Sequence, residues 1–320
     1  MAECYLYRLP NELLLHLFAP IPTPGLLPLT ILSSRIHTII LRILHNRLVA
    51  AAELHSHTLL LECYHPSAKL TEPPYFCTYH GTDGLSLYDD SESAQRNVGR
   101  LGDMYNMYSR FRPYRRELED GGRRVLPRPG DVAGSRTFPG TVQDKYQGDT
   151  VKQMLGLEAH ELFTQLVAQT NLVKIGPRKG LFTCFVGVEE GVLRVWRDWL
   201  SDMAAMGPVA DKIVEREIET AGKGKAALKE AVGRPVNLAD PRILWVNASK
   251  NSGIRFNIME RKLQNNAPIL IRNDEDMPVS YEIEYDELLI RTSYLLLMLE
   301  KSMVQEDNSS GKAVVFGSFG

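Results

Sequence analysis

The segment that decides the fold of the N-terminal region reads Leu9-Pro10-Asn11-Glu12-Leu13-Leu14-Leu15-His16-Leu17-Phe18. Pro10 suits the first turn of a helix, where its missing N–H costs no hydrogen bond. Glu12 complements the positive end of the helix dipole. The apolar residues that recur at the spacing of one helical face are Leu13, Leu14, Leu17 and Phe18. The segment is therefore predicted to form a short helix with more apolar surface than it can bury by itself.

Two further helices are expected before residue 54. The first helix ends at the run that contains Pro20, Pro22 and Pro24, since proline and the residue before it resist the helical conformation. A second helix is predicted over residues 26–33 and a third over 34–54, with an apolar side made of Ile36, Ile39, Ile40, Ile43, Leu44 and Leu48. Such a small helical unit usually needs a partner to cover it. The pattern leaves open whether the partner is the following domain or a second protein.

The residues of this region resemble an F-box. The resemblance covers roughly residues 4–48 and is carried by Leu9-Pro10-x-Glu12-Leu13-Leu14-x-x-Leu17-Phe18, Leu26-Leu27-Pro28-Leu29 and Ser33-Ser34-Arg35. Where the family often has a tryptophan soon after the last element, this chain has Ile36-His37. The resemblance implies docking of the helices on the Skp-type adaptor of a cullin–RING ubiquitin ligase, through Leu9, Pro10, Leu13, Leu14, Leu17, Phe18, Leu26 and Leu29. Docking of an apolar helix face in a groove is a common mode of recognition.

Later segments resemble a large group of F-box proteins from filamentous fungi. The similar stretches are residues 61–73, 81–86, 109–113, 195–200 and 317–320. The resemblance implies a substrate-recognition subunit of an SCF-type (Skp–cullin–F-box) ubiquitin ligase. Its expected partners are the adaptor, a cullin reached through that adaptor, and a target protein with or without a modification.

The part of the chain after residue 54 is predicted to be rich in β-structure. Strands are expected at 57–64, 172–175, 242–246, 254–262, 268–272, 279–285 and 313–316, with a hairpin formed by 181–188 and 192–199 around a turn at 189–191. A helix is predicted over 287–304, a long irregular loop over 91–156 with at most a short helix near 98–110, and a helical insertion over 202–232. These elements predict an α+β protein with an F-box helical domain (1–54) and a mainly antiparallel, β-sandwich-like domain (55–320). An analogy with plant lectin-like domains suggests an alternative function, a ligand-binding β-sandwich with no ligase role.

Composition and charge argue against nucleic-acid binding, membrane insertion and secretion. The chain has 320 residues, 44% hydrophobic and 24% charged, and a formal net charge of −2, so no overall field draws it to nucleic acid. No apolar run is long enough for a membrane span, and the N-terminus does not resemble a signal peptide. Its four cysteines are too few and too scattered for a disulfide framework. We therefore expect a cytoplasmic or nuclear protein.

The sequence contains residues that could suggest a zinc site, a nucleic-acid site or a phosphate-binding loop. Zinc binding by Cys63, His65, Cys77 and His80 is disfavoured by the one-residue gap between the first two. A cluster of arginines between residues 110 and 124 has interleaved aromatic residues, yet acidic neighbours interrupt it, and a solvated loop is favoured over a nucleic-acid site. No catalytic motif is recognisable, and 222–225 lacks the glycine and hydroxyl positions of a phosphate-binding loop. The sequence therefore predicts neither enzyme activity nor a cofactor or metal.

Overall fold

A computed structural model of the chain describes residues 5–68, 72–85, 100–114, 150–175, 182–207, 237–261 and 278–308. The helices in these ranges are α1 (Asn11–Phe18), α2 (Thr23–Leu26), α3 (Ser34–Glu53), α4 (Arg100–Tyr105), α5 (Arg197–Ala205) and α8 (Thr292–Asn308), with 3₁₀ turns η1 (Tyr5–Arg8), η2 (Leu27–Ile31) and η3 (Pro66–Ala68). The strands are β1 (His57–Tyr64), β2 (Tyr75–Thr82), β3 (Tyr108–Tyr114), β4 (Lys152–Leu157), β5 (Phe163–Ile175), β6 (Phe182–Trp196), β7 (Ile243–Trp245), β8 (Ser252–Arg261) and β9 (Val279–Arg291). The predicted α+β class is confirmed.

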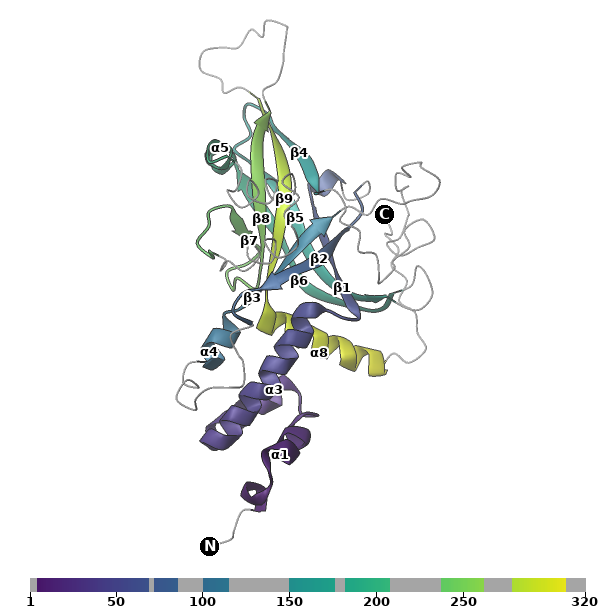
Figure 1. Cartoon of the computed structure of the whole chain (residues 1–320). Coiled ribbons are helices and arrows are strands. Elements are labelled where there is room, and N and C mark those ends of the chain that lie inside the picture. The colour runs from purple at the N-terminus through teal and green to yellow at the C-terminus, as the bar shows by residue number, and fades with distance from the viewer. Residues whose placement is uncertain are drawn as a thin grey trace, which may run out of the picture.

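The strands form one sheet rather than a sandwich of two. The order of the nine-stranded sheet is β6-β5-β1-β2-β3-β9-β8-β7, and β4 pairs with β9 beside this path. All pairings among the described strands are antiparallel. One side of β9 pairs with β8, and the other pairs with β4 near its start and β3 near its end. The sandwich prediction was wrong because long strands with register shifts let one sheet curl strongly (Figure 1).

The curled sheet is nearly closed, since its two end strands approach one another. Just after β7, Asn247 donates from Nδ2 to Glu189 Oε1 of β6 at 2.6 Å. The predicted hairpin turn at residues 189–191 is wrong, because β6 continues through these residues as a partner of β5. Gly191 serves close packing instead: a Cβ there would lie 2.6 Å from Val246 Cγ1 and 3.3 Å from the Val246 carbonyl oxygen.

Replacing Gly191 with alanine is therefore expected to lower the free energy of unfolding by about 1–3 kcal/mol, because the extra methyl group forces the two ends of the sheet apart. Gly187 on the same strand provides the control, since a Cβ there would meet only Asn171 Oδ1, at 3.9 Å. Chemical denaturation of both variants measures the difference. Equal destabilisation by the two substitutions would show that the ends of the sheet do not touch as described.

Of the three helices predicted before residue 54, the first and the third are present as single helices and the second is not. The predicted first and third helices correspond to α1 and α3. The second is divided into α2 and the 3₁₀ turn η2, each with a proline in its first two positions. Proline cannot donate a backbone hydrogen bond, so this segment forms two short turns rather than one regular helix.

Strand β9 extends further than predicted and displaces the start of the last helix. The expected helix over residues 287–304 begins only at Thr292, because Leu288, Leu289 and Ile290 belong to the strand. All three side chains are fully buried. A strand covered on both faces reads as a continuous apolar run, which resembles a buried helix in sequence. Within the same strand, the predicted alternation is confirmed, with Tyr281, Ile283 and Tyr285 in the core.

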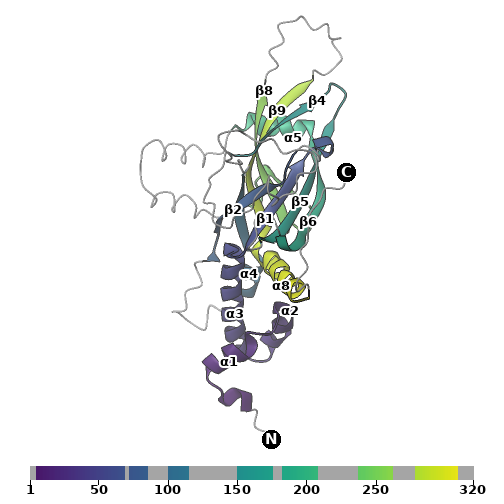
Figure 2. The ribbon, with the colours of Figure 1, turned by 90° about the vertical axis from the view of Figure 1, so that its right-hand side faces the viewer.

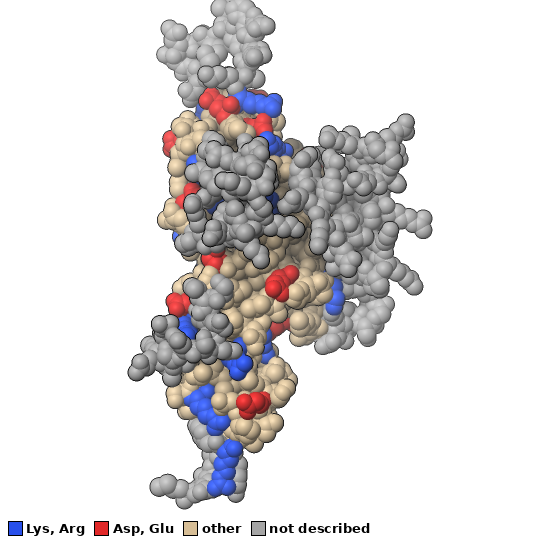
Figure 3. Space-filling view, viewed as in Figure 1, with Lys and Arg blue, Asp and Glu red and all other residues tan. Residues whose placement is uncertain are grey.

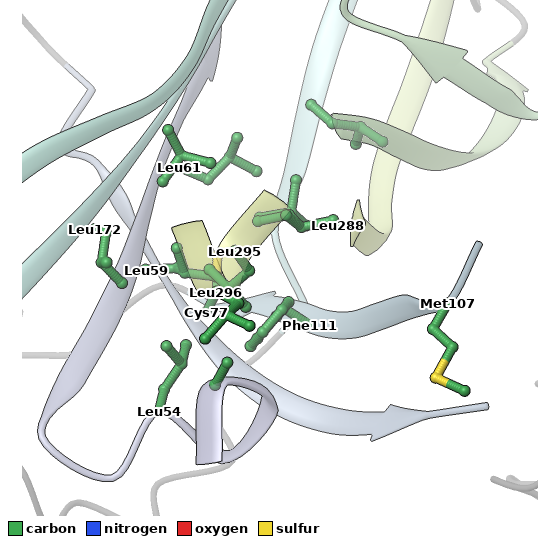
Figure 4. Close-up of a cluster of buried hydrophobic side chains, with 14 of the residues drawn as sticks. Leu54, Leu59, Leu61, Cys77, Met107, Phe111, Leu172, Leu288, Leu295 and Leu296 are labelled. Carbon is green, nitrogen blue, oxygen red and sulfur yellow. The ribbon is translucent and has the colours of Figure 1, made fainter. Parts of the chain in front are cut away.

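Helix α8 lies across one end of the curled sheet and joins it to the N-terminal helices. It contacts β6 and α3, and Figures 1 and 2 both show α3 running past α8 from the base of the sheet, with α1 at the end away from the sheet. One continuous hydrophobic core runs from Leu14 of α1 through α3 and α8 to the interior of the sheet. Figure 4 shows the point where Leu59 and Leu61 of β1, Phe111 of β3 and Leu295 of α8 meet. Leu54, which has a φ of 47°, ends α3 shortly before β1 begins.

The loop expected over residues 91–156 contains more regular structure than the short helix near 98–110 that the sequence allowed, since it includes β3 and most of β4 as well as α4. The helical insertion expected over 202–232 overlaps the end of α5, and residues 208–232 lie outside the described residues. Leucine and methionine side chains of these elements are buried at only scattered positions, so their short apolar patterns did not stand out in the sequence. The predicted strands at 268–272 and 313–316 lie outside the described residues.

Candidate functional site

The three N-terminal helices divide their apolar side chains between a core and an exposed face. Leu14, Phe18 and Leu26 are at most 6% exposed and pack in the hydrophobic core with α3. Leu9 and Leu29 are half-buried against the same core. Pro10, Leu13 and Leu17 are exposed. The structure therefore corrects the expectation that all eight predicted residues form a contact surface, because three of them hold the helices together from beneath.

The exposed face extends beyond the predicted residues. Its large apolar side chains and their exposed fractions are Leu13 (51%), Leu17 (49%), Leu27 (41%), Ile31 (87%) and Leu32 (59%). We call these five exposed residues together the apolar face, and one of them, Leu27, also lines a pocket between α3, α4 and α8. The last three were not predicted, because in this segment the resemblance implies contacts only through Leu26 and Leu29. Figure 3 shows the helical end as largely uncharged surface between a few charged side chains.

Hydrogen bonds from the start of α3 fix the position of α1. Ser33 caps α3, its hydroxyl accepting from the Ile36 N–H at 3.2 Å. Arg35 donates to Asn11 Oδ1 at 2.8 Å and to the Leu9 carbonyl oxygen. Ser33 and Arg35 belong to the Ser-Ser-Arg element of the sequence. That element thus has a local structural purpose, which is to start α3 and to hold the Leu-Pro start of α1 against it.

A second polar cluster ties the helical unit to the end of the chain. Glu300 of α8 accepts from the Thr23 N–H at 3.1 Å and forms an ion pair with Arg47 of α3 at 3.0 Å. Arg47 also donates to the carbonyl oxygens of Ala19 and Ile21, at 2.9 and 2.6 Å. These bonds fix the turn between α1 and α2 relative to α8. The apolar face is consequently held in one orientation with respect to the sheet.

The four residues considered for zinc do not form a site. Cys63 and Cys77 are buried in the core, whereas His65 is exposed and lies 2.7 Å from the Ser67 hydroxyl. His80 instead faces Glu287, with its Nδ1 3.4 Å from Oε1. Burial raises the pKa of the Cys63 thiol to about 12, against a weaker opposing effect of its hydrogen bond with Tyr285, so the thiolate that zinc requires is disfavoured. Among the described residues, no group of three or more His, Cys, Asp or Glu side chains is placed to hold a metal ion.

The arginine cluster is not the solvated loop that the sequence suggested, as far as it is described. Arg110 and Arg112 belong to β3, and Arg110 forms a buried ion pair with Asp83 at 3.1 Å. The aromatic residues beside them, Tyr108 and Phe111, are 5% and 0% exposed and cannot stack on bases. The arginines from 115 to 124 lie outside the described residues.

A network of buried charges lies on the side of β8 and β9 that faces away from the core. A register shift between Arg255 and Phe256 places both Asp286 and Glu287 opposite Arg255. Arg255 contacts Asp286 at 2.9 Å and Glu287 at 3.0 Å, and the two carboxylates are only 3% exposed. Burial alone would raise the pKa of Glu287, but the His80 hydrogen bond and the positive charge of Arg255 outweigh it, and the pKa is lowered. This network consists of paired charges and provides no evident acid or base for catalysis.

A second exposed apolar patch lies where β5 begins and β6 ends. Phe163 and Trp196 are paired in register, 37% and 47% exposed, with ring centroids 5.1 Å apart. The Arg194 guanidinium lies over the Phe163 ring at 5.0 Å. Trp196 leads into α5, which Figure 1 shows at the opposite end of the molecule from α1. This patch was not recognised in the sequence, because only the pairing of the first residue of β5 with the last residue of β6 brings the two rings together.

Comparisons with protein-family models, with curated protein sequences and with solved structures found no match. None of the helices in the described part of the chain combines the length and hydropathy that crossing a bilayer requires.

Proposed function

We propose that the chain is an F-box substrate receptor of an SCF-type ubiquitin ligase. The observation that carries the proposal is the apolar face, which exposes large side chains from α1 and η2 over a well-packed helical core. An exposed cluster of large apolar side chains is typical of an interaction site. The proposed occupant is a Skp-type adaptor, because the same segment carries the F-box sequence pattern. The adaptor would in turn connect the chain to a cullin.

The connection between the helices and the sheet suits a receptor that positions a target. Arg47 and Glu300 fix the turn between α1 and α2, and α3 packs on α8 through a continuous core. A rigid connection holds a bound target at a set distance and direction from the adaptor. A flexible linker would leave this geometry undefined. The relative placement of the two ends is therefore part of the proposed function.

Leu13→Asp and Leu17→Asp are each expected to weaken adaptor binding by about tenfold or more, because each places a charge in an apolar contact. Neither should unfold the protein, since both side chains are about half exposed. The measurement is co-purification of a Skp-type adaptor with the full chain, followed by titration of the purified pair. Met154→Asp is the matched control. Met154 is 52% exposed, and it belongs to β4, which is far from α1 in the sequence. Unchanged adaptor binding in both leucine variants would exclude the apolar face as the docking site.

The Phe163–Trp196 patch is the proposed contact for the target. Aromatic residues and arginine are enriched among the residues that contribute most to protein interfaces. Trp196→Ser is expected to lose the proteins that co-purify with the wild-type complex while the adaptor stays bound. Quantitative mass spectrometry of the two purifications measures this. Retention of every co-purified protein would exclude the patch as the target contact.

The same exposed aromatic pair also favours the alternative of a ligand-binding domain with no ligase role, because flat aromatic rings provide a surface for sugar rings. A glycan-array signal that disappears in Trp196→Ser, from a protein that fails to bind any Skp-type adaptor, would support this alternative. Adaptor binding without a glycan signal would support the receptor.

A further inference from the structure

A pocket of about 560 Å³ lies where the N-terminal helices, α4 and α8 meet. It is lined by Thr23, Leu27, Leu44, Leu48, Leu101, Gly102, Met104, Tyr105, Asn251, Arg291, Ser293, Tyr294, Leu296 and Leu297. Its volume falls in the range of pockets that bind small molecules, roughly 300–1,000 Å³. Leu48, Met104 and Leu296 are buried in its wall, whereas Tyr105 and Leu297 are 56% and 37% exposed. The pocket is therefore apolar inside and accessible from solvent.

Arg291 is the one charged residue in the lining of this pocket. Its Nη2 donates to the Tyr108 hydroxyl at 3.0 Å and to the Ser249 carbonyl oxygen at 3.1 Å. Its guanidinium lies over the Tyr105 ring at 4.5 Å. These contacts fix the position of the positive charge. None of them neutralises it, since Arg291 has no carboxylate partner among the described residues, and its Nε is buried without a hydrogen-bond acceptor there.

Three other polar side chains of the lining are already engaged, and the Asn251 amide and the Tyr105 hydroxyl complete its polar groups. The Thr23 hydroxyl contacts Glu300 and Arg47, the Ser293 hydroxyl donates to the Tyr105 carbonyl oxygen at 3.3 Å, and the Tyr294 hydroxyl donates to the Val188 carbonyl oxygen at 2.9 Å. Glu300, which contacts Thr23 of this wall, is paired with Arg47. A ligand would therefore meet apolar carbon over most of the pocket and one unneutralised cation at its wall.

We propose that this pocket binds an amphipathic organic acid, with its apolar body against the leucine and methionine side chains and its carboxylate on Arg291. Guanidinium groups are well suited to carboxylates because they offer several donors in a planar arrangement. The ligand would contact α3 of the helical unit and α8 of the sheet domain together, and would stabilise their junction. The pocket shares Leu27 with the apolar face, but the inference does not require adaptor docking and is tested on the isolated chain.

Gly102 offers a way to close the pocket without disturbing its wall. It lines the pocket from α4, and a Cβ at this position would meet no atom within 4 Å. Gly102→Phe is therefore expected to fill the pocket, whereas Gly102→Ala is the matched control that adds only a methyl group. Alanine is also favoured over glycine in a helix, so the control should fold at least as well as the wild type.

The probes are decanoate and 1-decanol, titrated separately into the full chain below their aggregation limits and followed by calorimetry. We expect saturable one-to-one binding of decanoate that is at least about tenfold tighter than binding of decanol. Gly102→Phe should weaken decanoate binding by about tenfold or more, and Gly102→Ala should not. Arg291→Lys should keep the preference for the acid, and Arg291→Met should abolish it.

Several results would overturn the proposal. Unchanged decanoate binding in Gly102→Phe would place the ligand elsewhere, and equal binding of acid and alcohol by the wild type would remove the role of Arg291. Failure of the wild type to bind either probe would exclude this class of ligand. Because Arg291 also contacts Tyr108 and Ser249, each Arg291 variant is first compared with the wild type by circular dichroism. If Arg291→Lys and Arg291→Met are both misfolded, two other comparisons decide the outcome. These are decanoate binding by Gly102→Phe and Gly102→Ala, and binding of decanoate and decanol by the wild type.

Discussion

Replacement of Arg255 by methionine is expected to lower the free energy of unfolding by about 3–5 kcal/mol, as when one partner of a buried ion pair is removed. Arg255 contacts both Asp286 and Glu287, and the two carboxylates are only 3% exposed. Methionine has a similar length and fills most of the space. It leaves two buried negative charges without their cation, and that uncompensated burial is the source of the expected loss.

The control is an ion pair on the same strand that is open to solvent. Arg261 contacts Glu282 at 3.0 Å, but its side chain is 63% exposed. Arg261→Met is therefore expected to change stability by at most about 1 kcal/mol, because solvent screens the pair. Urea denaturation of both variants measures the contrast. A loss in Arg255→Met as small as that in Arg261→Met would show that the Arg255 network is not buried as described.

The same network predicts how stability depends on pH. The pKa of Glu287 is lowered in the folded protein, so its contribution is present above its unfolded pKa and is lost as the pH falls through the folded value. In Arg255→Met the positive charge that helps to lower this pKa is gone, so the ionised Glu287 carboxylate is costly to bury. Acid protonates this carboxylate and removes that cost. The difference in stability between wild type and variant is expected to be largest near neutral pH and to shrink below about pH 4.5. Urea midpoints measured across this range test it, and a pH-independent difference would exclude a charge effect.

The neighbouring residues Leu14 and Leu13 are expected to differ sharply in their effect on stability. Leu14 is 1% exposed and Leu13 is 51% exposed. Leu14→Ala should lower the free energy of unfolding by about 2–5 kcal/mol, since it removes buried methyl groups and leaves a cavity. Leu13→Ala should change it by no more than about 0.5 kcal/mol, as is usual for an exposed position.

This pair separates the supporting core from the apolar face. Thermal or urea unfolding of the full chain gives the two stabilities, because the helices share one core with the sheet. An equal effect of the two substitutions, or a larger effect of Leu13→Ala, would contradict the orientation of α1. A correct orientation also makes Leu13→Ala a clean probe of binding, since its fold is preserved.

The N-terminal helices were predictable because their signals are local. Pro10, Glu12 and Ser33 mark where α1 and α3 begin, and the apolar period shows which side is covered. Strand β1 was predicted with its observed limits from a short β-prone run. The sheet order was not predictable, because β1 lies between β2 and the much later β5. Pairing between distant strands leaves no periodic trace in the sequence.

The errors in the second half have a common physical origin. Glycine is a common turn residue, but Gly191 lies within a strand, where the absence of a side chain lets Val246 from the other end of the sheet pack against it. Leu288 to Ile290 have the composition of a helix, but they lie in a strand that is covered on both faces. In both cases a tertiary contact decides the role of the residue, and a local pattern does not contain that contact.

The candidate site was only partly visible in the sequence. Leu13 and Leu17 were predicted at exposed positions of a docking helix, and the structure places them on the surface. Leu14, Phe18 and Leu26 belong to the same repeating pattern, yet they face the core. Ile31, at the end of η2, and Leu32, directly after it, are exposed but are not among the residues that the resemblance implies. The sequence thus indicated the segment, and the fold determined which side chains are available.

The most direct test of adaptor docking is hydrogen exchange of the full chain with and without a saturating Skp-type adaptor. The proposal predicts slower exchange of backbone amides in residues 9–32, which include α1 and η2, and no change at the start of β5 and the end of β6, around Phe163 and Trp196 at the far end. Absence of protection in residues 9–32 despite complex formation, or protection confined to the sheet, would contradict the proposed docking of the apolar face.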